Sequence, residues 1–138
     1  MIDLATGTER ILAHVNQPTG PQVSRYRVNV QNVDFMAEFS IGRALREADF
    51  LVIDEIAPME LYSSSFRQAV LRALESPKPL LGVVHERTRT GFIGEIKRRP
   101  DVELWVVTPE NRAELHLELA EAIRKVLNPR DADPHTPR

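Results

Sequence analysis

Short apolar runs, each followed by residues with helical spacing, dominate the chain from residue 50 onward. The runs are residues 50–53, 80–84 and 102–107. The first of them has no polar alternation, which is typical of a strand buried on both faces of a parallel sheet. Apolar residues at helical spacing follow each run, among them Phe66 and Val70, Phe92 and Ile96, and Leu115 and Leu119. The pattern therefore predicts the order β-α-β-α-β-α and a parallel sheet with helices packed on it.

Capping residues and prolines place the ends of these helices. Ser63, Ser64 and Ser65 offer N-caps for the first helix. The triplet 108–110 predicts the start of the last helix, because Thr108 suits the N-cap and a proline follows it at the first helical position. That helix should run to Leu127.

A different pattern occupies residues 1–33. An apolar run at 10–15 and an alternating segment at 26–30 flank a dense set of turn formers at 16–21. This arrangement predicts a short β-hairpin.

Helical spacing begins after the hairpin region. Residues 35–48 carry apolar side chains at helical intervals, with Asp34 at the expected N-cap. The predicted organisation is therefore a hairpin region at 1–33, a helix and three β-α units at 34–127, and a disordered tail at 128–138, which holds three prolines and no apolar periodicity.

Composition narrows the class of protein. The 138 residues include 18 Lys and Arg against 20 Asp and Glu, so the formal net charge of −2 gives no nucleic-acid signal. The chain has no Cys and thus no disulfide or thiolate chemistry. No apolar run is long enough for a membrane span, and residues 1–10 lack the pattern of a signal peptide. We expect a cytoplasmic α/β protein that binds neither nucleic acid nor membrane.

Candidate chemistry should lie just after the strands, because ligands of parallel sheets bind outside the carboxyl ends of the strands. The segments that follow the three predicted strands are Asp54-Glu55, His85-Glu86-Arg87 and residues 108–112. Residues 50–55 have the form of a Walker B strand, four apolar residues and then two acids. The first acid of such a strand can hold Mg²⁺ beside phosphates, and the second can orient or deprotonate a water molecule. Adjacent carboxylates also occur as a solvated turn or as a cap.

The phosphate-binding loop that accompanies a Walker B strand is not found in these residues. Such a loop has the form G-x-x-x-x-G-K-[ST], in which backbone N–H groups and a lysine hold the phosphates. None of the lysines, Lys78, Lys97 and Lys125, follows a glycine or precedes Ser or Thr. This absence distinguishes the chain from a complete nucleotide-binding site.

Four separated segments resemble one family. Residues 54–61 read D-E-I-A-P-M-E-L and are followed by Phe66-Arg67, which resembles the segment D-E-I-G-x-M-E-L…F-R of the THEP-type nucleoside-triphosphatases, a group that includes the cancer-related nucleoside triphosphatase. Residues 26–30, residues 108–112 (T-P-E-N-R) and residues 3–7 (D-L-A-T-G) resemble further segments of that family in the same order. The resemblance runs from about Met1 to Leu127.

The resemblance implies a fold, an activity and a set of roles. The implied fold is a Walker-type, RecA-like parallel sheet with an additional strand, and the implied activity is Mg²⁺-dependent hydrolysis of ATP, GTP and other nucleoside triphosphates to the diphosphate and phosphate. Asp54 would be the acid on the magnesium side, and Glu55 the general base or water-positioning residue. The implied nucleotide-binding residues are Phe50, Leu51, Val52, Ile53, Asp54, Glu55, Ile56, Ala57, Thr108, Asn111 and Arg112. A plain N-cap for Thr108, and surface contacts for Asn111 and Arg112, are the alternatives.

The departures from the family pattern also carry expectations. Roughly the first third of a family member, with its phosphate loop, has no counterpart here, so we expect a sheet incomplete at its N-terminal side and a chain that is inactive alone. The missing strand leaves three possibilities. The remaining strands pair directly, another segment or a second chain fills the gap, or the chain is only marginally stable. Ala57 stands where the family has Gly, and an alanine at positive φ would be strained.

Three functions remain open at this point. The first is a nucleoside-triphosphatase of which these residues are a fragment. The second is a non-catalytic nucleotide-binding or interaction module of the same fold. The third is an unrelated α/β binding domain of the flavodoxin-like kind, for which the similarity of residues 54–61 would be coincidental.

Overall fold

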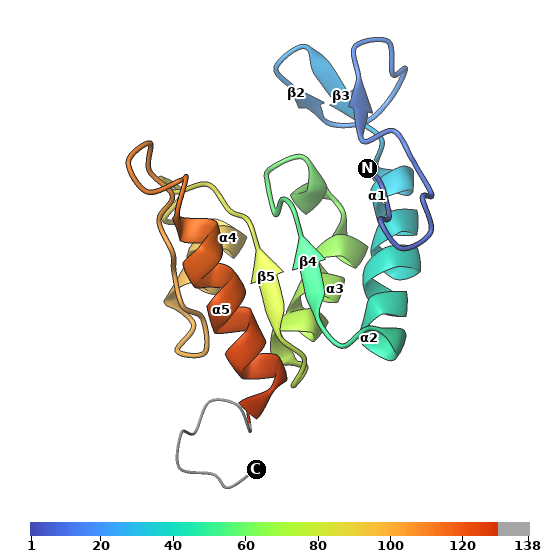
Figure 1. The fold of residues 1–138 in the computed structure, drawn as a ribbon. Helices are drawn as coiled ribbons and strands as arrows, with labels where there is room; N and C mark the ends of the chain where they lie inside the picture. Colours follow the sequence, from blue (N-terminus) through green and yellow to red (C-terminus); the bar gives the residue numbers. More distant parts are fainter. Residues whose placement is uncertain (130–138) are drawn as a thin grey trace, which may run out of the picture. The chain divides into compact units, whose positions relative to one another are not determined.

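The computed structural model describes residues 1–129 (Figure 1). The chain divides into two units, Met1–Arg98 and Arg99–Arg138, and each is described by itself. The disorder predicted for the tail falls largely on residues 130–138, which lie outside the described residues.

The first unit begins with a small antiparallel sheet of three strands. These are β1 (Ala13–His14), β2 (Gln22–Val23) and β3 (Tyr26–Val28), in the order β1-β3-β2. Ala13 pairs with Val28, as the predicted hairpin requires, but β2 is an additional strand that the pattern does not reveal. Gly20 has a φ of +109°, and a Cβ there would lie 2.1 Å from the carbonyl oxygen of Val28, so only glycine fits this close approach.

One continuous helical segment follows the sheet. It consists of α1 (Val30–Met36), a π-helical stretch η1 (Ala37–Gly42) and α2 (Arg43–Glu47). The predicted start at Phe35 is wrong, because Asn29 is the N-cap and accepts a hydrogen bond from the N–H of Asn32 at 3.0 Å. Asp34, the predicted cap, instead accepts a hydrogen bond from the hydroxyl of Ser63.

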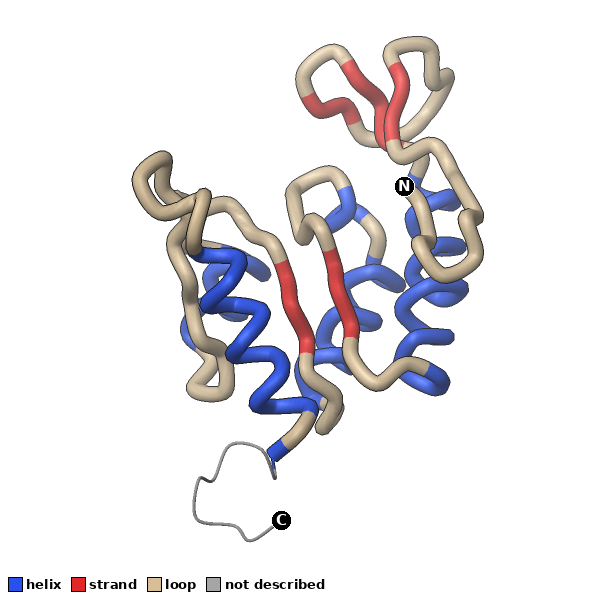
Figure 2. The backbone as a smooth tube through the Cα atoms, viewed as in Figure 1, coloured by secondary structure: helices blue, strands red, loops and turns tan. Residues whose placement is uncertain are grey.

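A second sheet of this unit consists of two parallel strands, with helices beside it (Figure 2). Strand β4 (Leu51–Ile53) leads through a 3₁₀ turn, η2 (Glu60–Tyr62), into α3 (Ser64–Glu75). Strand β5 (Leu80–Gly82) leads into α4 (Gly91–Arg98). Helix α3 packs against η1 and α1. This β-α-β-α order, the two strands and the N-cap at Ser63 confirm the prediction for residues 50–98.

The core of the unit lies between the helices and one face of the sheet. Leu51 and Ile53 are buried, but Val52 between them is 53% exposed, because successive side chains of a strand point to opposite faces. The expectation that this strand is buried on both faces is therefore wrong within the described residues. The fully buried side chains include Val28, Val33, Ala69 and Val70.

The second unit differs most from the sequence prediction. Residues 102–107 form no strand, since no ladder of backbone hydrogen bonds pairs them with another described strand, and Leu104, Val106 and Val107 are exposed. Helix α5 (Leu115–Leu127) begins several residues after the predicted Thr108 cap, because residues 109–114 form turns. Among the described residues, no helix has the length and apolar composition needed to cross a membrane.

Candidate functional site

Asp54 and Glu55 stand at the carboxyl end of β4, and both are exposed. The chain beyond them stays bound to the chain beyond β5. Val83 donates its N–H to Ile53 at 3.0 Å, and Ile56 donates its N–H to Val83 at 2.8 Å. The peptide bond that joins the two acids is cis. The hydrogen bonds with Val83 therefore fix the backbone on either side of the two carboxylates.

His85 meets Glu55 at this edge of the sheet. The distance between His85 Nε2 and Glu55 Oε2 is 3.6 Å, and the two side chains are 56% and 44% exposed. The segments that follow the first two apolar runs, where candidate chemistry was expected, therefore approach each other at these two residues. An imidazole beside a carboxylate can donate a hydrogen bond that fixes the direction of the carboxylate.

The turn after Glu55 is shaped by buried residues. Ile56 and Ala57 are buried, and the carbonyl of Ala57 accepts the N–H of Leu61 at 3.3 Å. Among the described non-glycine residues, only Ser24 has a positive φ, so Ala57 avoids the strain expected at a family glycine position. Arg67, which belongs to the resembling segment, donates to the carbonyl of Leu61 and so braces the same turn.

Glu60 is a buried acid, close enough to Glu55 to be affected by its charge, that the sequence pattern did not single out. Its residue is only 8% exposed, and its Oε2 has no hydrogen-bond partner within the described part of the chain. Burial raises the pKa of the Glu60 carboxyl, and the negative charge of Glu55 raises it further. An acid between two apolar residues of the resembling segment was the available signal.

Lys97 was also missed, because its partners are backbone atoms that no pattern of residue types reveals. From α4 its ammonium group donates to the carbonyls of His85, Glu86 and Thr88, the last two at 2.9 Å. We call residues 85–88 the histidine loop. Three of its backbone carbonyls therefore accept hydrogen bonds from the same ammonium group.

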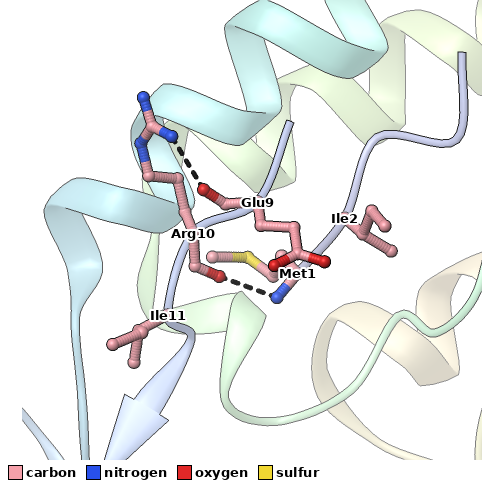
Figure 3. A pocket seen from close by; sticks show the side chains of 5 residues that line it. All are labelled: Met1, Ile2, Glu9, Arg10 and Ile11. Carbon is pink, nitrogen blue, oxygen red and sulfur yellow. Dashed lines mark hydrogen bonds between the residues drawn. The ribbon is translucent and has the colours of Figure 1, made fainter. Parts of the chain in front are cut away.

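An apolar cleft of about 300 Å³ lies beside the turn after Glu55. Pro58, Tyr62 and Phe92 are among its lining residues, and Thr88 and Thr90 add hydroxyl groups. A larger pocket of about 580 Å³ lies at residues 1–2 and 9–11, where the Met1 amino group donates to the carbonyl of Arg10 at 2.7 Å (Figure 3). The residues that line this larger pocket include none of the acids discussed above, so the candidate site is placed at the end of β4.

Thr108 and Asn111 hold each other in the second unit. The Asn111 Oδ1 accepts the N–H of Thr108 at 2.7 Å, and the Thr108 hydroxyl oxygen accepts the N–H of Asn111 at 3.2 Å. The Asn111 side chain also donates to the carbonyl of Val106 at 2.8 Å. These bonds build a closed turn, which explains the late start of α5. Arg112 is exposed, next to this turn.

Comparison with known proteins extends these observations over most of the chain. A family model described as NTPase matches residues 1–120. A protein named nucleoside-triphosphatase THEP1 from Thermofilum pendens is 46% identical over 126 residues, which are 91% of this chain and 69% of that relative. The protein of the same name from Pyrococcus abyssi is 42% identical over 127 residues, covering 92% and 67%.

A solved structure shows the same likeness. The crystal structure of THEP1 from the hyperthermophile Aquifex aeolicus matches with a TM-score of 0.71 and 26% sequence identity, over 85% of this chain and 72% of that one. The present chain spans about two thirds of the length of the curated relatives above. Its mixed α/β fold, with a parallel sheet flanked by helices, agrees with this neighbour.

Proposed function

This chain belongs to the family of THEP1-type nucleoside-triphosphatases, and on that premise we propose that its site serves the hydrolysis of nucleoside triphosphates to the diphosphate and phosphate. One observation carries the proposal. Asp54 and Glu55 stand exposed, side by side, at the carboxyl end of a parallel strand inside the region that matches the family. Ligands of parallel sheets bind at this end of the strands.

The two acids take different roles in the proposal. Asp54 would hold Mg²⁺, with residues 50–57 forming a Walker B segment. Its exposed carboxylate suits this ion, which is commonly bound through one or two carboxylates, water and substrate phosphates. Bound Mg²⁺ would neutralise charge on the phosphates. Glu55 would orient the attacking water or accept its proton, as the second acid of a Walker B strand can.

We further propose that residues 108–112 form the part of the site nearest the base or ribose. Thr108 and Asn111 already use their polar groups on each other and on Val106. Their role is thus to shape the turn, and the exposed Arg112 is the residue left to contact the nucleotide. ATP and GTP are the substrates to test first.

The phosphates themselves need a cradle that these 138 residues do not encode, since no G-x-x-x-x-G-K-[ST] occurs among them. We propose that this chain alone has negligible turnover, because positioning of the phosphates is most of the catalysis in phosphoryl transfer. A preceding segment, or a second chain, would complete the site. We retain a cytoplasmic location as a prediction.

The absence of that cradle also favours a second function, a nucleotide-binding or interaction module without catalysis. Calorimetry with MgATP and MgGTP tests the nucleotide site that both functions share, and an assay of phosphate release tests whether these residues catalyse by themselves. We expect weak binding that is reduced at least about tenfold in Asp54→Asn, without phosphate release. Asp49→Asn, an exposed acid before the strand, is the control.

Turnover that disappears in Glu55→Gln would instead establish catalysis by these residues alone. If neither nucleotide binds, or if Asp54→Asn and Asp49→Asn bind alike, the proposed site at the end of β4 is wrong.

A further inference from the structure

The histidine loop is held through its backbone carbonyl groups. An ammonium group has three N–H donors, and Lys97 directs hydrogen bonds to three carbonyls of residues 85–88. The Lys97 side chain therefore links three backbone positions of the loop.

Further contacts hold α4 against residues 85–89. Arg98 donates to the carbonyl of Arg89 at 3.1 Å, and Arg89 itself donates to the carbonyl of Glu86. Gly94 lies so close that a Cβ there would be 2.3 Å from the carbonyl oxygen of Arg89. Helix α4 and the segment 85–89 thus pack closely together.

The contact between His85 and Glu55 needs this support. Both side chains are about half exposed, and an ion pair between exposed groups contributes little free energy of its own. Its geometry must therefore come from the two backbones. That of Glu55 is tied to the chain after β5 through Val83, and that of His85 is tied to α4 through Lys97.

We propose that His85 is a positioning residue for Glu55, and that Lys97 acts through the histidine loop to set it. This inference rests on the proposed function, which gives Glu55 its role toward the attacking water. His85 Nε2 lies 3.6 Å from Glu55 Oε2, so a proton on Nε2 would attract this oxygen and leave the other carboxylate oxygen free for the attacking water. Nothing is transferred between His85 and Glu55 in this role, which is to fix a direction.

The test uses nuclear magnetic resonance of the free 138-residue chain. The ring signals of His85 are assigned by their loss in His85→Gln. We expect Glu55→Gln to shift these signals in the native background, and the shift to fall at least about threefold in Lys97→Met, which removes the donors but keeps a long side chain. Lys125→Met, at an exposed lysine of α5, is the matched control and should leave the response unchanged.

Two further measurements guard against a purely structural effect. The side-chain carboxyl carbon signal of Glu55 should move in His85→Leu and return toward its native position in His85→Gln, which restores a donor. Amide exchange at residues 86–90 should accelerate about tenfold or more in Lys97→Met while that of α3 stays constant, which shows that the protein remains folded.

The inference is overturned if Glu55→Gln leaves the His85 signals unmoved, or moves them equally with and without Lys97. It is also overturned if His85→Leu and His85→Gln affect Glu55 alike. The proposed function is judged separately by adding MgATP to the same samples. Lack of any response at Asp54 and Glu55 would refute nucleotide binding, while the coupling of His85, Glu55 and Lys97 would still be measured.

Discussion

The ion pair between the buried Asp3 and the partly exposed Arg43 should contribute substantially to the free energy of unfolding of the first unit. Asp3 Oδ2 lies 2.6 Å from a guanidinium nitrogen of Arg43, and the Asp3 side chain is 2% exposed. Its Oδ1 accepts the N–H groups of Ala5 and Thr6, both at 2.9 Å. Asp3→Asn keeps that acceptor, removes the charge and places an NH2 donor where Oδ2 accepts from Arg43.

The size of the effect follows from the pKa of Asp3. Burial alone would raise it, but hydrogen bonds from Ser40, Arg43 and Thr6 outweigh burial and lower the pKa from 3.8 to about 2. At about 1.4 kcal/mol per pKa unit, and with a reduction because Arg43 is partly exposed, we expect Asp3→Asn to lower the free energy of unfolding by about 2 kcal/mol.

The pH dependence gives the sharper test. Because the pKa is lower in the folded state, the stabilisation is complete above pH 3.8 and is lost as the pH falls through about 2. Urea unfolding followed by far-ultraviolet circular dichroism at pH 7, 4.5, 3 and 2 should show the difference between native and Asp3→Asn shrinking only in the last two steps. Asp49→Asn, at an exposed acid, should differ little from native throughout. A difference at pH 7 below about 0.5 kcal/mol, or one that persists undiminished at pH 2, would refute the reasoning.

Three further changes test the packing around the site. Glu60→Gln should raise the free energy of unfolding at pH 7. The pKa of Glu60 is raised in the folded state, so native stability falls as the pH rises above the ordinary pKa of 4.5, and the variant avoids this loss. Urea titrations should show the gain vanish near pH 4, and a loss of stability at pH 7 would contradict the prediction. Ser63→Ala should cost about 2 kcal/mol in the same assay, since the buried hydroxyl caps α3 through the N–H of Phe66 at 3.0 Å, whereas Ser64→Ala should cost under about 0.5 kcal/mol, and equal effects would reject the cap. Gly94→Ala should lower the melting temperature, because the alanine Cβ would collide with the carbonyl of Arg89. This collision should outweigh the helix propensity of alanine, which favours the helix by about 1 kcal/mol over glycine. A rise in the melting temperature would show that the segment at Arg89 moves aside without cost.

Local patterns identified much of the first unit. The run at 50–53, the serine cap at 63 and the helical spacing of Phe66 and Val70 are encoded over a few residues each, and the structure confirms them. The placement of Glu55 and His85 at one edge also followed from sequence, because parallel strands carry their carboxyl ends to the same side. The resemblance of residues 54–61 indicated the family, which the comparisons show.

Choices between competing local signals could not be made in this way. Asn29 and Asp34 are both good N-caps, and Asn29 prevails because β3 ends just before it, while Asp34 is taken by Ser63 from a distant segment. Thr108 and Asn111 close a turn on each other, so the helix that Thr108 predicted begins later.

The sequence by itself determined the strand that carries Asp54 and Glu55, the helices that flank it and the family, because these depend on periodicity and on residues close in the chain. Only the tertiary structure decided that residues 102–107 form no strand and that Val52 stays exposed, since pairing and burial depend on what lies alongside. It also decided the roles of Glu60 and Lys97. One is buried by packing, and the other is bound to carbonyls that every residue type possesses.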